Sequence, residues 1–422
     1  MKLLTRLFFF LPISIFAQNN QRILLKADRV FDGEEMHTGW LVLINGNTIE
    51  AVGSITNLPA NTITITMPGT TLLPGLIEGH SHLFLHPYNE TSWNEQVLTE
   101  SRTERTARAI NHAKTTLLAG FTTVRDLGTE GAMYDDAALK KTIEKGIVPG
   151  PRMIVATRAI VAKGTYGPKS DNPDLEYPQG AAEVGNANEI SNEARVQISK
   201  GADLIKIYAD YRWGAKKEAA PTFSIEEIAA AVAVAKSGGR EVVAHATSAE
   251  GMRRAILGGV SVIEHGDNGT PEIFALMKEK NVALCPTISA GEAIAVYRAT
   301  AKGIAIDSAD IKQKMSSFAM ALKANVIICM GGDVGVFAHG DNVREMEAMV
   351  RGGMPAIAVL RSATSVNATV FGYAGEMGRL KKGLLADIIA VTGDPSKDIS
   401  ALRKIVLVVK NGVIYKNTME VK

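Results

Sequence analysis

Apolar and polar residues alternate in short runs at both ends of the chain, whereas the middle follows another pattern. Near the start the short β-rich runs cover residues 23–33, 40–46, 48–53 and 62–69. The last fifty residues repeat this style over 386–395, 405–412 and 413–417. The dipeptide Asn411-Gly412 is a strong hairpin signal. These runs predict one small β-sandwich domain that is formed by both chain termini.

The middle of the chain alternates strand-like and helix-like segments. Amphipathic stretches such as 224–239 and 249–259 end in glycine pairs, as helices often do. Between such stretches lie eight apolar strand candidates, at 72–80, 120–128, 151–159, 202–210, 241–248, 260–267, 281–289 and 326–333. Eight β-α units favour a closed (β/α)8 TIM barrel over an open doubly wound sheet, so we predict an α/β fold.

The first 17 residues have the layout of a signal peptide. Lys2 and Arg6 supply positive charge, the run from Leu7 to Phe16 is largely apolar, and a polar stretch follows Ala17. The run is too short to span a bilayer comfortably, although an uncleaved anchor is the alternative. We predict export to the periplasm or the extracellular space, with no membrane contact after cleavage. The predicted segments are the signal peptide 1–17, sandwich 18–72, barrel 73–368 and sandwich 369–422.

Composition and charge narrow the classes of partner. Hydrophobic residues make up 46% and charged residues 21%, which is ordinary for a soluble globular protein. The formal net charge of +2 gives no sign of a nucleic-acid or anionic-membrane partner. Only Cys285 and Cys329 are present, both in apolar segments, so we predict buried free thiols, with a disulfide across the core as the alternative. Two cysteines also exclude a cysteine-based zinc site.

Candidate metal ligands stand at the ends of the predicted barrel strands. In such a barrel the active site lies at the C-terminal ends of the strands. His80 and His82 are two apart on an extended segment, so both side chains point to the same side. His245 and His265 end two later strands, so four of the eight histidines converge on one rim. Neutral imidazole is a preferred zinc ligand, and the pattern predicts a metal site.

Lys206 and Asp333 extend this candidate site. Lys206 lies inside an apolar strand, where an unpaired ammonium is costly. Its amine either reaches solvent at the strand end or is carboxylated by CO2, and the resulting carbamate can bridge two metals. Asp333 follows Gly331-Gly332 at the end of the last strand. Its carboxylate can bind a metal and take a proton from metal-bound water, or it can cap the following helix.

These segments resemble the amidohydrolase superfamily, and within it the imidazolonepropionase-like group that includes metal-dependent Xaa-Pro dipeptidases (prolidases). LLPGLIEGHSH is similar to the strand-1 motif, and GADLIKIY to the strand-4 segment that carries a carboxylated lysine. VVAHATS, VIEHG and GGDVG are similar to the ligand segments of strands 5, 6 and 8. Two positions depart from the pattern, because Glu78 stands where aspartate is common and Gly332 where threonine is frequent.

The resemblance implies a metal-dependent hydrolase of carbon–nitrogen bonds with two divalent ions, zinc by default. It places His80, His82 and Asp333 on the more buried ion. It places His245 and His265 on the second ion, with carboxylated Lys206 and a hydroxide as bridges. The hydroxide would attack the scissile carbonyl, with Asp333 and His265 in the catalytic set. Relatives with one metal, such as imidazolonepropionase itself, typically lack the strand-4 lysine, so Lys206 favours the two-metal, peptidase-like branch. The substrate expected from that branch is a small molecule or dipeptide, such as Xaa-Pro or an N-acyl amino acid.

Candidates for substrate contact are less specific. Tyr208 follows Lys206 on the same strand face and can donate to the carbonyl, or it is a packed barrel tyrosine. The other candidates are loop residues near strand ends, each with a solvated or packed alternative: His86, Tyr88, Arg158, Arg212 and His339. Residues 161–187 can form a lid or wall over the pocket. A lactam, lactone or imidazolone-type ring hydrolase and a non-catalytic extracellular binding protein stay open, and many relatives form homo-oligomers.

Overall fold

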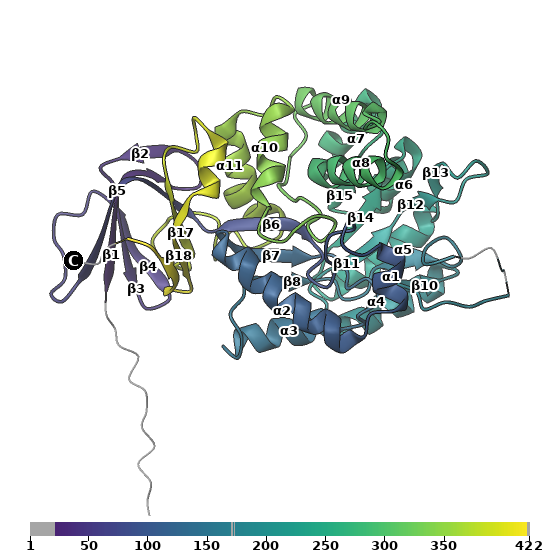
Figure 1. Ribbon diagram of the computed structural model, residues 1–422, viewed down its shortest axis with the longest axis horizontal. Coiled ribbons are helices and arrows are strands. Elements are labelled where there is room, and N and C mark those ends of the chain that lie inside the picture. Colours follow the sequence, from purple (N-terminus) through teal and green to yellow (C-terminus); the bar gives the residue numbers. More distant parts are fainter. Residues whose placement is uncertain (1–21, 170–171, 173, 420–422) are drawn as a thin grey trace, which may run out of the picture.

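A β-rich lobe lies beside a larger α/β barrel in the computed structural model, which describes residues 22–169, 172 and 174–419 (Figure 1). The predicted signal peptide, residues 1–17, lies outside this described part. Within the described part no helix combines the length and the apolar character needed to cross a membrane. The separate sheets of the β-rich lobe and the barrel confirm the predicted α/β fold with a terminal β domain (Figure 1).

Both ends of the chain build the β-rich lobe. Its sheet has the order β19-β18-β17-β5-β1-β3-β4, with β2 paired to β1. The N-terminal strands are β1 (Ile23–Phe31), β2 (Met36–Thr38), β3 (Leu41–Asn45), β4 (Thr48–Gly53) and β5 (Ile63–Pro74). The C-terminal strands are β17 (Ile388–Thr392), β18 (Ile405–Lys410) and β19 (Val413–Asn417). The long strand β5 pairs with β1 on one side and β17 on the other, so it joins the two ends of the chain.

The barrel consists of parallel strands whose C-terminal ends share one rim. Seven of them are regular: β6 (Leu76–Ser81), β7 (Phe121–Asp126), β8 (Arg152–Val155), β11 (Ile205–Tyr208), β14 (Val242–Ala246), β15 (Val262–His265) and β16 (Ala283–Cys285). The N–H of Asp203, just before β11, donates to the carbonyl of Val155 at 2.7 Å and so links β8 to β11. These strands are almost completely buried, as expected for a parallel sheet covered by helices.

The eighth barrel segment is not the regular strand that the sequence predicts. Ile328 bridges to Leu284 and Val334 bridges to Ser81, and these two isolated bridges close the barrel. The reason lies in how closely this segment approaches β6. A Cβ on Gly331 would lie 2.7 Å from the backbone nitrogen of His80, so only glycine fits there. Asp333 then turns into the left-handed region, with φ +60°.

Helices surround the barrel, and several begin at a side-chain cap. Ser224 and Ser92 form capping boxes, and Asn186 accepts from two backbone amides. The helices are α1 (Trp93–Leu98), α2 (Arg102–Leu118), α3 (Asp135–Glu144), α4 (Ala187–Lys200), α5 (Ile225–Ser237), α6 (Ala249–Gly258), α7 (Pro271–Lys280), α8 (Ile288–Lys302), α9 (Ala309–Lys323), α10 (Val343–Arg351), α11 (Ala356–Arg361) and α12 (Asn367–Val370). A π-helical turn (Ser362–Val366) and a 3-10 turn (Ile399–Arg403) complete them.

Four short strands follow the C-terminal ends of β8 and β11 at the rim of the barrel. β9 (Ile160–Ala162) and β10 (Ala182–Val184) belong to the long segment after β8 and pair in parallel, and β9 also pairs with β11 in the barrel sheet. β12 (Asp210–Arg212) and β13 (Ala219–Pro221) form a hairpin after β11. Both excursions rise from the C-terminal ends of the barrel strands, so they flank the rim where the sequence places the candidate ligands.

Candidate metal centre and active site

Four histidines and an aspartate gather at the rim. The ring centroid of His80 lies 5.3 Å from that of His82 and 5.1 Å from that of His265. The rings of His245 and His265 are 4.4 Å apart. Oδ1 of Asp333 lies 3.5 Å from Nε2 of His80 and 3.3 Å from Nε2 of His82. Side chains separated by up to 253 positions in the sequence therefore face a common centre.

Neighbouring groups fix the orientation of three of the rings. Nδ1 of His80 lies 2.9 Å from a carboxylate oxygen of Glu264, and Nδ1 of His82 lies 2.8 Å from the carbonyl of Gly128. Nδ1 of His265 lies 2.7 Å from Oγ1 of Thr287. Because carboxylate and carbonyl oxygens only accept, the Nδ1–H groups of His80 and His82 donate, and their Nε2 lone pairs face the centre.

These lone pairs fit a metal ion. Two Nε2 atoms and an Asp333 oxygen would repel one another unless a cation or a proton lies between them. Ligand atoms of His80, His265 and Asp333 all lie within 4.8 Å of one another, a spacing that can hold a metal ion. Without an ion a proton takes this place. Burial opposes the charge on His82, but Asp333 outweighs it and raises the pKa of His82 to about 9.

Lys206 projects into the same site from β11. Its side chain is buried, and its Nζ has no hydrogen-bond partner among the described residues. Burial lowers the pKa of Lys206, which favours the neutral amine. Native proteins rarely leave a buried amine without a partner, so this atom points to a group that binds it or modifies it.

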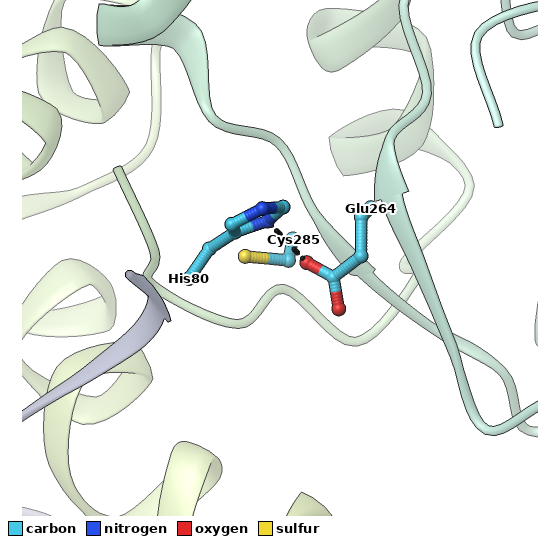
Figure 2. A group of neighbouring side chains, drawn as sticks. All are labelled: His80, Glu264 and Cys285. Carbon is cyan, nitrogen blue, oxygen red and sulfur yellow. Dashed lines mark hydrogen bonds and ion pairs between the residues drawn. The ribbon is translucent and has the colours of Figure 1, made fainter. Parts of the chain in front are cut away.

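Glu264 is the anchor of His80, and sequence reasoning missed it. Figure 2 shows its carboxylate against the His80 ring, with the Cys285 sulfur close by. Its second oxygen accepts from Arg125 at 2.6 Å. Burial alone would raise the pKa of Glu264, but Arg125 and then His80 outweigh it and lower the pKa to about 2. The visible signal was an acidic residue inside the apolar run VIEHG.

Cys285 stays a thiol in this setting. Both cysteines are buried and free, as predicted. Ligand atoms of His80, Glu264 and Cys285 also lie within 4.8 Å of one another. Arg125 already neutralises Glu264 there, and burial raises the pKa of Cys285 well above its usual value. A cation is therefore expected at Nε2 of His80, on the side where Asp333 lies.

Glu78, noted in the sequence only as a departure from aspartate, joins the first strand to the last segment. One carboxylate oxygen accepts from the backbone amides of His80 at 3.0 Å and Gly332 at 2.8 Å. The other accepts from the Asn342 side chain at 2.8 Å. Complete burial raises the pKa of Glu78 to about 7. The longer glutamate side chain therefore positions the two strand ends that carry His80 and Asp333.

Backbone strain is concentrated at two candidate ligands. His265 has φ +77° and Asp333 has φ +60°, although non-glycine residues rarely adopt the left-handed region. The N–H of Asp333 donates to the carbonyl of His80 at 2.9 Å, which holds this conformation. Such strain persists mainly where surrounding structure fixes it, and it clusters at functional sites.

Tyr208 and Tyr88 are the two candidates for substrate contact that lie beside the centre. The Tyr208 ring stacks on the His245 ring at 4.5 Å, and its hydroxyl donates to Glu130 at 3.5 Å. Burial, followed by the charge of Asp333, raises the pKa of Tyr88 well above its usual value. Both phenols are therefore neutral donors. The segment after β8 also lies beside Tyr208, because the ring centroids of Tyr166 and Tyr208 are 4.8 Å apart.

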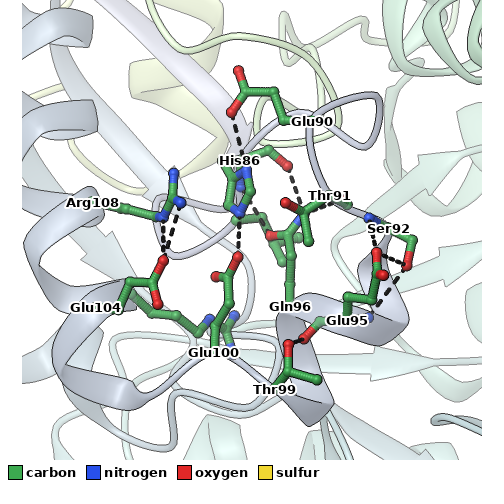
Figure 3. A network of polar contacts seen from close by, with 12 residues as sticks. His86, Glu90, Thr91, Ser92, Glu95, Gln96, Thr99, Glu100, Glu104 and Arg108 are labelled. Atoms are coloured by element: carbon green, nitrogen blue, oxygen red, sulfur yellow. Dashed lines mark hydrogen bonds and ion pairs between the residues drawn. The ribbon is translucent and has the colours of Figure 1, made fainter.

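Three other candidates have partners elsewhere. Figure 3 shows His86 between Glu90 and Glu100, with ring nitrogens 3.2 Å and 2.7 Å from the two carboxylates. His339 stacks on His112 of α2 at 4.2 Å, and its Nε2 lies 3.0 Å from the carbonyl of Leu85.

The guanidinium of Arg158 donates to the carbonyl of Ala181 at 2.7 Å, and the Arg212 side chain is exposed. The structure brings neither His86 nor Arg158 into contact with the candidate ligands, and His339 interacts with the main chain of His82. These side chains contact residues of the loops and helices around them, and the sequence pattern does not reveal such contacts.

Comparison with known proteins agrees with this geometry. A model of the amidohydrolase family matches residues 71–415. The chain belongs to the amidohydrolase family. It is 28% identical to ochratoxinase of Aspergillus niger, over 91% of this chain and 84% of that protein. A solved Xaa-Pro dipeptidase with bound methionine in its active site has 32% identity and a TM-score of 0.83, covering 94% of this chain and 100% of the other.

A second solved relative is a prolidase complexed with N-methylphosphonate-L-proline. It is 25% identical, with a TM-score of 0.80, and covers 94% of this chain and 100% of that one. Family membership makes the chain a hydrolase that acts on carbon–nitrogen bonds of small molecules. This conclusion decides against a non-catalytic binding protein.

One prediction concerns the support of His265. Thr287→Val removes the oxygen that contacts Nδ1 of His265 but keeps the shape of the side chain. We expect metal affinity to fall about 10- to 100-fold, as is usual when a partner of a metal-bound histidine is lost. Competition with a chromogenic chelator measures this affinity. Thr70→Val, another buried threonine whose hydroxyl bonds a carbonyl in the β lobe, should leave it unchanged. Equal affinity in both variants would show that Thr287 does not position the ring.

Proposed function

We propose that this amidohydrolase is an exported enzyme that uses two divalent metal ions, zinc by default, to cleave dipeptides such as Xaa-Pro or N-acyl amino acids. The observation that carries the proposal is the convergence of four imidazoles and Asp333 at the rim that also holds the buried amine of Lys206, which has no hydrogen-bond partner among the described residues. Export rests on the predicted signal peptide at residues 1–17.

The chain offers a ligand set for each ion. His80, His82 and Asp333 would hold the more buried ion, since Oδ1 of Asp333 faces both Nε2 atoms. His245 and His265 would hold the second. The neutral amine of Lys206 can add CO2 with release of a proton, and the carbamate so formed would supply anionic oxygen ligands to the metal centre. When bound, the metals would polarise the scissile carbonyl and acidify a water molecule.

Asp333 moves the proton in this scheme. Burial opposes its ionisation, but His80 and His82 outweigh it and hold the pKa of its carboxyl below the usual value. The carboxylate is therefore free to accept a proton from the attacking water and pass it to the leaving amine. Tyr208 and Tyr88 stand beside the centre as neutral donors that can orient the substrate.

The relatives support amide substrates of this size. One solved neighbour is an Xaa-Pro dipeptidase and another a prolidase. We expect the metal-replete protein to hydrolyse members of an Xaa-Pro or N-acyl amino acid library, and a chelator to abolish the activity. Ninhydrin detection of released amino acids measures turnover. Hydrolysis of lactones or lactams alone would replace the proposed substrate class, and turnover that survives complete metal removal would refute the metal-dependent mechanism.

A further inference from the structure

A buried carboxylate that no assigned role explains lies beside the candidate metal centre. Glu130, in the loop after β7, has 2% of its surface exposed. One oxygen accepts from the hydroxyl of Tyr166 at 2.5 Å and from the indole N–H of Trp93 at 3.0 Å. The other has only a long contact, 3.5 Å, to the hydroxyl of Tyr208. All three donors are neutral, and no ion pair of this carboxylate occurs in the described part of the chain.

Arg105, a cation that interacts with the charge of Glu130, makes its hydrogen bonds elsewhere. The guanidinium of Arg105 donates to the main-chain carbonyls of Phe84, Thr129 and Glu130, not to the Glu130 carboxylate. A buried anion without a paired cation is costly. Glu130 also adopts φ +48°, a left-handed conformation that is unfavourable for a glutamate. Unpaired charge and strain at one residue are typical of a position kept for a ligand.

Aromatic rings surround this carboxylate. Tyr166 lies 4.8 Å from Tyr208, 4.9 Å from Tyr211 and 5.3 Å from Trp93, measured between ring centroids. The faces of such rings attract cations, and the attraction increases when water is excluded. Carboxylate and rings together therefore match a positively charged amine better than a neutral or anionic group.

Two contacts connect this group to the centre. The Tyr208 ring that reaches Glu130 also stacks on His245, with an interplanar angle of 16°. Gly128, two positions before Glu130, accepts from Nδ1 of His82. Glu130 therefore stands next to the residues that would bind the scissile carbonyl. In a dipeptide the α-ammonium is attached to the carbon beside that carbonyl, so a group that recognises it has to lie beside the centre.

We propose that Glu130 and the rings of Tyr166, Tyr208 and Tyr211 bind the α-ammonium of the substrate. The inference rests on the proposed function and narrows it. It assigns dipeptides with a free N-terminus as the substrate class, in preference to N-acyl amino acids, lactones and lactams, which carry no ammonium at this position.

The test compares two substrates that differ only in the amine. Leu-Pro carries the α-ammonium, and 4-methylpentanoyl-proline replaces it by hydrogen. For the metal-replete full chain we expect kcat/KM to favour Leu-Pro by about 10- to 100-fold, the usual range for a charge-assisted hydrogen bond. Glu130→Gln keeps the side-chain shape and should lose that factor for Leu-Pro alone. Equal losses on both substrates would reduce Glu130 to a positioning residue for Tyr208 and overturn the proposal.

Glu100→Gln is the matched control. Glu100 is also a nearly buried glutamate, but it contacts His86 away from the centre. We expect it to leave the preference for Leu-Pro unchanged. A loss of preference in this control as large as that in Glu130→Gln would contradict a specific role of Glu130.

A binding measurement that needs no variant separates this inference from the proposed function. Calorimetry on the metal-replete wild type compares L-leucine with 4-methylpentanoate. Tighter binding of leucine supports the ammonium subsite even if neither proline substrate is hydrolysed, an outcome that would refute the proposed function alone. If 4-methylpentanoate binds as well as leucine, the ammonium subsite is refuted, whatever the hydrolysis assay shows.

Discussion

Replacing Asp333 by Asn is expected to lower kcat by about 10²- to 10⁴-fold, the range typical of a lost general acid–base group. Metal content should stay near that of the wild type, because asparagine keeps an oxygen where Oδ1 faces His80 and His82. The amide cannot take up a proton from water or pass it to the leaving amine. Turnover of Leu-Pro and elemental analysis of the same sample measure both effects.

The control for this variant is Asp341→Asn. Asp341 lies a few residues later and pairs with Arg403 at 2.6 Å on the surface. We expect it to leave kcat within about twofold, since surface substitutions usually change little. If Asp333→Asn retained a comparable turnover, the proton would be carried by another group. If it lost metal instead, ligation rather than proton transfer would explain the defect.

The fold could be predicted from the sequence because the terminal strands and the β-α units of the barrel differ in the spacing of their apolar residues. Alternating runs at the two ends predicted the terminal β lobe, and the pairing of β5 with β1 and β17 explains why the two ends must meet. The convergence of the candidate ligands was predictable because they stand at the ends of strands. His80, His82, His245 and His265 each end an apolar strand, and parallel strands in a barrel bring such ends to one rim.

The prediction of a regular eighth strand was wrong, because the pattern of apolar residues does not show how closely two backbones approach each other. The run VIICMGGD is as apolar as a regular strand. In the structure its glycines let it lie against the backbone of His80, and Asp333 turns out of extended geometry. That packing is a contact between the first and last barrel segments, and no local window contains it.

The residues that tune the site could not be read from the chain for a related reason. Glu264 contacts His80 across 184 positions, and Glu130 contacts Tyr208 across 78. Their roles come from partners that only the closed barrel supplies. His86 and His339 show the reverse case, because they stand in suitable loops but turn to Glu100 and His112. Loop direction is set by such contacts and is invisible to motif spacing.

Lys206→Met should produce two opposite effects. The metal-replete variant is expected to lose at least one metal equivalent, because the side chain that would bridge the two ions is gone. The metal-free variant is expected to be more stable than the metal-free wild type by about 1–3 kcal/mol, because a buried amine without a hydrogen-bond partner is replaced by an apolar group of similar length. Elemental analysis and urea unfolding after chelation measure the two quantities.

Lys314→Met gives the matched comparison for the stability effect. Lys314 is also nearly buried, but its Nζ donates to Asp267 at 2.6 Å and to Thr287 at 3.3 Å. Its loss leaves Asp267 and Thr287 without that donor, so this variant should be less stable than the wild type. A gain in Lys206→Met beside a loss in Lys314→Met would mean that the chain tolerates one unfavourable lysine for the sake of its metal centre. Two equivalents of metal still bound to Lys206→Met would remove the bridging role.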